Sequence, residues 1–214
     1  VMLDFGISSH QIDEPERGFS YMCADAPLDM RMDTSAPLTA EDVINDYPQA
    51  ELARILKEYG EERFASKIAA NVAEARAHSR IKTCGEFVKL IEESIPQKFR
   101  QNGPVARKSF QAVRIEVNGE LSGLYEAVLG LTRRLKKGGR IAVLTFHSLE
   151  DRIVKNAFRY LETDCICPKE LPVCVCGKKK EIEVLTKKPV MAGPKEMVIN
   201  SRSRSAKLRV AQKI

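Results

Sequence analysis

The sequence predicts an α/β fold with an all-helical insert, and three observations carry that prediction. Residues 1–5 and 141–146 are short apolar runs, which are typical of buried strands in a parallel sheet. Between them, residues 39–95 carry apolar side chains at helical spacing. Residues 206–210 alternate between apolar and basic side chains, which is the period of a strand.

The first strand places candidate site residues at its carboxyl end. Asp4 and Gly6 end the apolar run, and ligands of open α/β sheets bind outside the carboxyl ends of strands. Asp4 could instead cap the following turn through its own backbone. Ser8 and Ser9 follow on a tight loop, where they line an acceptor pocket or stabilise the turn. Because no earlier strand precedes residue 1, we expect the chain to open in the middle of a domain.

The central segment reads as three or four helices with clear start signals. Thr39 with Asp42, and Thr83 with Glu86, have the spacing of N-terminal capping pairs. A basic loop is expected at 96–109, followed by one long helix from about 110 to 136. After the strand at 141–146, Ser148 and Asp151 are expected to cap the next helix. Two further strands are expected, near 183–186 and 206–210.

Composition limits the classes of partner. The 214 residues carry 35 Lys and Arg against 29 Asp and Glu, for a net charge of +6. This excess fits a polyanionic partner such as nucleic acid, although many bacterial proteins are simply basic. The sequence has no apolar run of membrane-spanning length and no secretion signal, so we expect a cytoplasmic protein without a membrane partner. Oligomeric state is not predicted.

Several sequence blocks resemble one family. Six segments carry the match, in the expected order: 4–13, 16–20, 27–33, 110–118, 146–155 and 200–210. Together they resemble the RsmH/MraW methyltransferases, bacterial enzymes that use S-adenosylmethionine to methylate N4 of a decoding-centre cytidine in 16S rRNA. The resemblance covers essentially the whole chain, and no single motif is as specific as the ordered set.

The resemblance implies a fold and a domain plan. It implies the later half of a Rossmann-like class I methyltransferase sheet, formed by residues 1–33 and 105–214, with a helical substrate-recognition insert at 34–104. Family members begin with three strand–helix units and a glycine-rich cofactor turn, so about 90 residues are expected to be missing. An isolated fragment of this kind is expected to be inactive. The alternative is a non-catalytic remnant that binds RNA or the ribosome, and a small metal-binding protein is a third, weaker interpretation.

The resemblance also assigns roles at the ligand edge. It implies that Asp4 and Gln11 contact the cofactor. The cytosine amine attacks the sulfonium methyl in a direct displacement, so the enzyme must orient the amine and accept its protons. No Pro-Pro pair follows Asp4. The hydrogen-bond acceptor is therefore Asp4, Ser8 or a backbone carbonyl of this loop. His147, at a strand's carboxyl end, either contacts a base or phosphate or bonds to nearby backbone.

Basic residues are candidates for rRNA contacts on the small ribosomal subunit. Arg107, Lys108 and Arg114 could hold phosphates, and Phe110 either packs in the core, which we favour, or stacks on a base. Arg202 and Arg204, together with Lys207 and Arg209, could add to the positive electrostatic field that attracts the phosphates. A solvated basic tail is the simpler interpretation.

Four cysteines form a compact pattern near the end of the chain. Cys165 and Cys167 are followed, after six residues, by Cys174 and Cys176. The two Cys-x-Cys pairs could close on one tetrahedral zinc ion, within a hairpin at 165–176. Stable disulfides are not expected in a cytosolic protein, and free thiols on a surface hairpin are the alternative.

Overall fold

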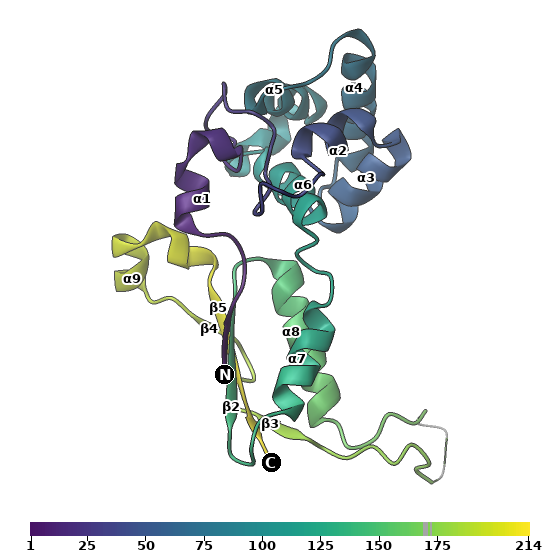
Figure 1. Ribbon diagram of the computed structural model, residues 1–214, viewed down its shortest axis with the longest axis vertical. Helices are drawn as coiled ribbons and strands as arrows, with labels where there is room; N and C mark the ends of the chain where they lie inside the picture. Colours follow the sequence, from purple (N-terminus) through teal and green to yellow (C-terminus); the bar gives the residue numbers. More distant parts are fainter. Residues whose placement is uncertain (169–170, 172) are drawn as a thin grey trace. The chain divides into compact units, whose positions relative to one another are not determined.

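The computed structural model describes residues 1–168, 171 and 173–214 and divides the chain into two compact units (Figure 1). One unit contains residues 1–6 and 121–214, and the other contains residues 7–120. The predicted insert at 34–104 lies within the second unit. That unit extends further at both ends because Phe19, Met30 and Phe110 pack into the same core as the helices between them.

The first unit is built on a mixed sheet, as the α/β prediction requires. Its strand order is β1–β2–β5–β3, and β4 pairs with β5 on the same edge as β3. The strands are β1 (Met2–Asp4), β2 (Arg140–Thr145), β3 (Ile182–Val184), β4 (Val190–Met191) and β5 (Lys207–Lys213). All four predicted strands are confirmed, and β4 is an addition.

The strand pairing determines which residues share an edge. β1 runs parallel to β2, with Asp4 opposite Leu144, whereas β5 is antiparallel to β2 and β3. The prediction that the first strand is buried was wrong, because Val1 and Met2 are exposed. In the described structure β1 is an edge strand with β2 as its only neighbour.

Helices cover the sheet within this unit. Figure 1 shows α7 (Leu124–Arg133) and α8 (Ser148–Glu162) side by side along the sheet. Val154 and Phe158 of α8 share a fully apolar core with Ile141 and Val143 of β2. Burial of these side chains holds α8 behind β2, and this fixes the turn that leads from β2 into the helix. Helix α9 (Pro194–Ile199) and the 3-10 helix η3 (Ser201–Ser205) precede β5.

The predicted long helix at 110–136 was wrong, because two helices occupy this stretch. Helix α6 (Arg107–Asn118) ends at Gly119, and α7 begins after Gly123. Both glycines have positive φ angles, 59° and 70°, a conformation that suits glycine and ends a helix. The boundary between the two compact units falls in this break.

The second unit is helical. Its elements before α6 are α1 (Ser9–Asp13), η1 (Pro15–Arg17), α2 (Ala40–Asp46), α3 (Gln49–Glu58), α4 (Ala65–His78), α5 (Cys84–Ser94) and η2 (Gln97–Asn102). The predicted caps are confirmed: Thr39 and Thr83 each accept a backbone N–H, and Asp42 and Glu86 complete reciprocal capping boxes.

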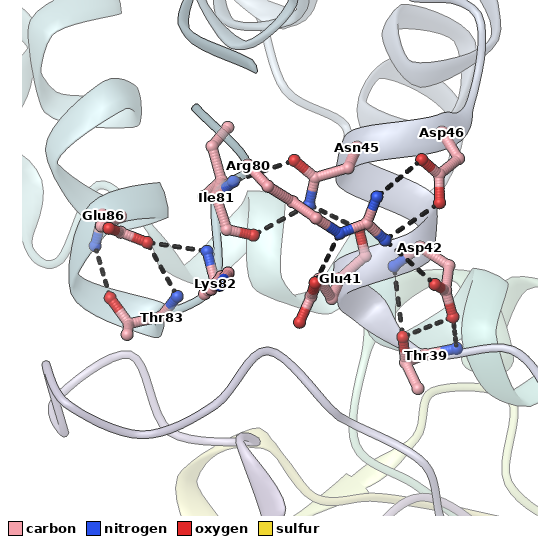
Figure 2. A network of polar contacts seen from close by, with 10 residues as sticks. All are labelled: Thr39, Glu41, Asp42, Asn45, Asp46, Arg80, Ile81, Lys82, Thr83 and Glu86. Atoms are coloured by element: carbon pink, nitrogen blue, oxygen red, sulfur yellow. Dashed lines mark hydrogen bonds and ion pairs between the residues drawn. The ribbon is translucent and has the colours of Figure 1, made fainter. Parts of the chain in front are cut away.

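A polar network joins α2 to the segment between α4 and α5 (Figure 2). The guanidinium of Arg80 lies 2.6 Å from Glu41 and 2.9 Å from Asp46. Asn45 bonds both backbone groups of Ile81, at 2.8 and 2.9 Å. The network fixes residues 80–82, just before the capping box of α5, relative to α2.

No helix in the described part of the chain has the length and apolar character needed to cross a membrane.

Candidate functional site

Asp4 and His147 lie at the carboxyl ends of two adjacent parallel strands. Asp4 ends β1 opposite Leu144 of β2, and His147 follows β2 by two residues. The backbone N–H of Phe5 donates to the carbonyl of Leu144 at 3.1 Å, so the pairing continues to the edge of the sheet. This is the edge at which α/β sheets bind ligands.

Gly6 allows the chain to leave β1 sharply beside this edge. Its φ angle is 91°, a conformation that L side chains rarely adopt. A Cβ atom at this position would also lie 3.4 Å from Cδ2 of Phe146. The backbone conformation, and not a lack of space, is therefore what favours glycine at this position.

The Asp4 carboxylate is exposed at the end of its strand. Within the described residues, no hydrogen bond or ion pair engages its side chain, so the alternative role as a turn cap receives no contact in support. A carboxylate in this position is free to accept hydrogen bonds from a ligand.

His147 caps helix α8, and the prediction that Ser148 and Asp151 form this cap was wrong by one residue. Nδ1 of His147 accepts the backbone N–H of Glu150 at 3.5 Å. Oε2 of Glu150 accepts the N–H groups of Phe146 at 2.8 Å and His147 at 3.2 Å. Burial favours a higher pKa for Glu150, but hydrogen bonds from His147 and these backbone groups hold the pKa below its usual value.

Ser8 and Gln11 belong to the other compact unit and bond each other. They form the capping box of α1: Ser8 Oγ accepts the Gln11 N–H at 3.2 Å, and Gln11 Oε1 accepts the Ser8 N–H at 2.9 Å. The structure therefore places Asp4 and His147 at the same edge of the sheet, and it joins Ser8 to Gln11 by hydrogen bonds.

The loop at 29–33 is a structured feature to which the sequence pattern alone assigned no role. Arg31 bonds both carboxylate oxygens of Asp29, at 2.9 and 2.7 Å, and also donates to the carbonyls of Thr34 and Ala36. The hydrogen bond from Arg31 is the main reason that the pKa of Asp29 lies below its usual value.

Met30, in the middle of this loop, has a strained backbone that one side chain secures. Its φ angle is 58°, in the left-handed region that non-glycine residues avoid. Asn118 of α6 donates to the carbonyl of Met30 at 2.7 Å and accepts the N–H of Met32 at 2.7 Å. In the sequence, only the block from Asp29 to Asp33 pointed to this loop. Its partner Asn118 lies 88 residues from Met30, so the sequence did not reveal the contact.

The basic residues of α6 differ in availability. Arg107 and Lys108 are exposed in the first turn of the helix and not in a loop as predicted. Arg114 makes a bidentate ion pair with Glu120, at 2.7 and 2.9 Å, and both side chains are largely buried. The Arg114 charge is therefore already matched by a carboxylate.

Phe110 is buried in the core of the helical unit, as favoured above. Its ring stacks on Phe87 at 5.5 Å and meets the edge of Tyr21 at 5.8 Å. Stacking of Phe110 on a base is wrong for this structure, because both neighbours are core residues or pack against the core.

The basic residues of the carboxyl-terminal tail also divide into two kinds. Arg202 and Arg204 lie in η3 and are exposed. Arg209 is buried on β5 and forms an ion pair with Asp151, and Lys207 lies 3.9 Å from the same carboxylate. The exposed arginines of η3 are the better candidates for contact with a polyanion.

The four clustered cysteines come together in the segment between α8 and β3. All are free thiols, and their sulfur atoms lie within 4.8 Å of one another. Cys23 is half-buried and Cys84 is buried, both in the helical unit.

The described chain thus combines an α/β unit, built on a mixed sheet, with a helical unit that lies between β1 and β2 in the sequence. The sequence matches the MraW methylase family over residues 1–214, and the chain belongs to that family. It is 52% identical to the ribosomal RNA small subunit methyltransferase H of Clostridioides difficile (strain 630), over the whole chain and 69% of that relative.

Other relatives of the same name are equally similar. The chain is 54% identical to the protein of Caldicellulosiruptor saccharolyticus, again over 69% of that relative. It is 53% identical to the protein of Geobacter sp. (strain M21), over 68% of its length. The aligned part spans this whole chain in each comparison.

Proposed function

We propose that this protein transfers a methyl group from S-adenosylmethionine to N4 of a decoding-centre cytidine in 16S rRNA. The observation that carries the proposal is the unpaired Asp4 carboxylate at the carboxyl end of β1, in a chain of the MraW methylase family. The relatives named small subunit rRNA methyltransferases support rRNA as the substrate.

Asp4 and Gln11 each fit this cofactor chemically. S-adenosylmethionine carries an ammonium group and ribose hydroxyls, which are donors for a carboxylate such as that of Asp4. Gln11 uses Oε1 within the α1 capping box, and this leaves its Nε2 amide able to donate to an acceptor. The cofactor supplies an electrophilic methyl group on a sulfonium, and the protein's own residues supply orientation.

Orientation of the cytosine amine is the main catalytic task, because alignment of reacting atoms supplies most of the acceleration. Of the two side chains proposed as acceptors of the amine protons, Asp4 is favoured over Ser8. The Ser8 hydroxyl already accepts the Gln11 N–H and donates to Gln11 Oε1 at 3.3 Å. His147 is engaged with Glu150, so we propose it as a positioning residue that fixes the turn after β2.

The rRNA contacts are proposed for exposed cations. Arg107 and Lys108 at the start of α6, and Arg202 and Arg204 in η3, are exposed and suited to phosphate. The helical unit is proposed to recognise the small-subunit substrate, in the cytoplasm. Arg114 is proposed to act indirectly in substrate recognition, because its ion pair with Glu120 holds the end of α6 in place.

Transfer to RNA tests this proposal directly. A full-length version of the protein, extended to the length of its relatives, is incubated with tritiated S-adenosylmethionine and small subunits from a strain that lacks this enzyme. The RNA is then digested to nucleosides for mass spectrometry. We expect label in N4-methylcytidine. Binding to rRNA without transfer of label would overturn the enzyme proposal and support the alternative of an RNA-binding protein.

A further inference from the structure

The cysteine segment between α8 and β3 takes no part in the proposed methyl transfer. Its four thiols nevertheless lie as close together as the ligands of one metal ion. Cys165 and Cys167 lie in the segment that follows α8, and Cys174 and Cys176 lie in the segment that leads to β3. Two short Cys-x-Cys segments, separated by six residues, thus face one another.

The distances between sulfur atoms exclude disulfides and match a shared ion. Cys165 and Cys174 lie 3.4 Å apart, and Cys174 and Cys176 lie 3.5 Å apart. The pairs Cys167–Cys174 and Cys165–Cys176 are both 3.9 Å apart. A disulfide needs about 2.0 Å. Four thiolates around zinc, at Zn–S distances of about 2.3 Å, would lie about 3.8 Å apart.

Backbone N–H groups point at three of the four sulfur atoms. Ile166 donates to Cys176, Cys167 donates to Cys165, and Val175 donates to Cys167, each at 3.4 Å. Two of these bonds cross from one Cys-x-Cys segment to the other. Such donors orient thiolate ligands and offset their negative charge, as the outer shell of a metal site does.

The described apolar side chains of this segment form no core of their own. From residue 163 to 180, none of the described apolar side chains is buried, and Ile166, Val173 and Val175 are largely exposed. A segment without a core needs another source of order, and small domains of this kind use a metal ion.

The surrounding charge suits an anionic cluster. Four thiolates and one divalent ion carry a net charge of about −2. The run Lys178–Lys180 follows Cys176 directly. Lys178 is held in place by the ring of Tyr160, at 4.5 Å, and by Glu181, at 3.9 Å.

We propose that Cys165, Cys167, Cys174 and Cys176 bind one Zn²⁺ ion as a closed tetrahedral site that holds the two Cys-x-Cys segments together. All four positions are taken by protein thiolates, so the ion has no open position for a substrate, and its role is structural. This inference is independent of the proposed methyl transfer.

Metal analysis of the untagged protein, purified without added metal or chelator, tests the proposal. We expect about one zinc per chain by elemental mass spectrometry. Cys174→Ser should lose the metal, whereas Cys23→Ser, which removes a half-buried thiol of the other unit, should retain it. Replacement by Co²⁺ should give the visible absorption of a tetrahedral tetrathiolate in the wild type and in Cys23→Ser only.

A second readout separates loss of metal from loss of fold. Chelation should speed tryptic cleavage after Lys178, Lys179 or Lys180 by at least about tenfold, while the far-ultraviolet circular dichroism of the helices is unchanged. Iron in place of zinc, a disulfide between any two of the four cysteines, or four thiols that react at once in metal-free wild type would each overturn the proposal.

Discussion

Asp151 of helix α8 and Arg209 of strand β5 form a bidentate ion pair, with Oδ1–Nε and Oδ2–Nη2 distances of 2.6 and 3.1 Å. The side chains are only 14% and 7% exposed. The pair joins the helix that follows the candidate site to the central antiparallel strand of the sheet. Removal of Asp151 leaves the buried Arg209 charge unmatched, and removal of Arg209 leaves Asp151 with only the more distant Lys207, at 3.9 Å.

We therefore expect Arg209→Met to lower the free energy of unfolding by about 3 kcal/mol. Chemical denaturation followed by circular dichroism measures this change. Arg204→Met removes an exposed arginine of η3 and should change stability by less than about 0.5 kcal/mol. Equal stability of the two variants would show that the buried pair contributes nothing.

The cap of α8 gives a second prediction. His147→Ala removes the side-chain acceptor and should cost about 1 kcal/mol, whereas His147→Asn restores a good capping residue and should cost much less. Thermal unfolding of both variants measures the difference. If His147→Asn keeps its stability but loses methyl transfer, the imidazole acts on the substrate and is more than a positioning residue.

Acid should weaken the loop at 29–33 in a defined direction. The pKa of Asp29 in the folded protein is lowered from its ordinary value of 3.8, first by its hydrogen bond with Arg31. Its contribution to stability is therefore present above about pH 3.8 and is lost as the pH falls through the lower folded value.

Asp29→Asn tests that direction. At pH 7 we expect the variant to be less stable than wild type by about 1–2 kcal/mol, and the gap should close below pH 3.8. Denaturation at a series of pH values measures the gap. A gap that is constant across this range would contradict a charged role for Asp29.

RNA binding should depend on the exposed cations. Arg107→Ala and Arg204→Ala should each weaken binding to rRNA and reduce the slope of log affinity against log salt by about 0.7–0.9. Filter binding at several salt concentrations measures the slope. Lys57→Ala, an exposed lysine of α3 outside the proposed set, should leave it unchanged. Unchanged slopes in all three variants would remove these arginines from the interface.

Local patterns predicted the features that depend on neighbours in sequence. The capping boxes at Thr39 and Thr83 need residues only three apart, and the strand at β5 alternates within seven residues. The break between α6 and α7 was missed because apolar side chains continue at helical spacing through it. Only the left-handed conformation of Gly119 and Gly123 reveals the break.

The pairing of charges could not be predicted, because it depends on distant or irregular chain geometry. Arg114 reaches Glu120 only because the chain turns back at Gly119. Arg209 meets Asp151 because β5 lies beside β2 and under α8, 58 residues apart in sequence. Arg114 and Arg209 are basic residues that the sequence alone offers as phosphate ligands, but within the fold each forms an ion pair with a carboxylate.

The central claim is that Asp4 at the carboxyl end of β1 takes part directly in methyl transfer. Asp4→Asn keeps the size of the side chain and removes its charge, and no contact within the described structure depends on that carboxylate. The matched control is Asp25→Asn, which removes an exposed carboxylate from a loop of the helical unit.

The most direct measurement is tritium transfer from S-adenosylmethionine to small subunits, with a full-length version of the protein that is extended to the length of its relatives. We expect Asp4→Asn to reduce transfer by at least about 100-fold, with an unchanged melting temperature, while Asp25→Asn matches wild type. Wild-type transfer in a folded Asp4→Asn protein would contradict the account and return Asp4 to a structural role at the end of its strand.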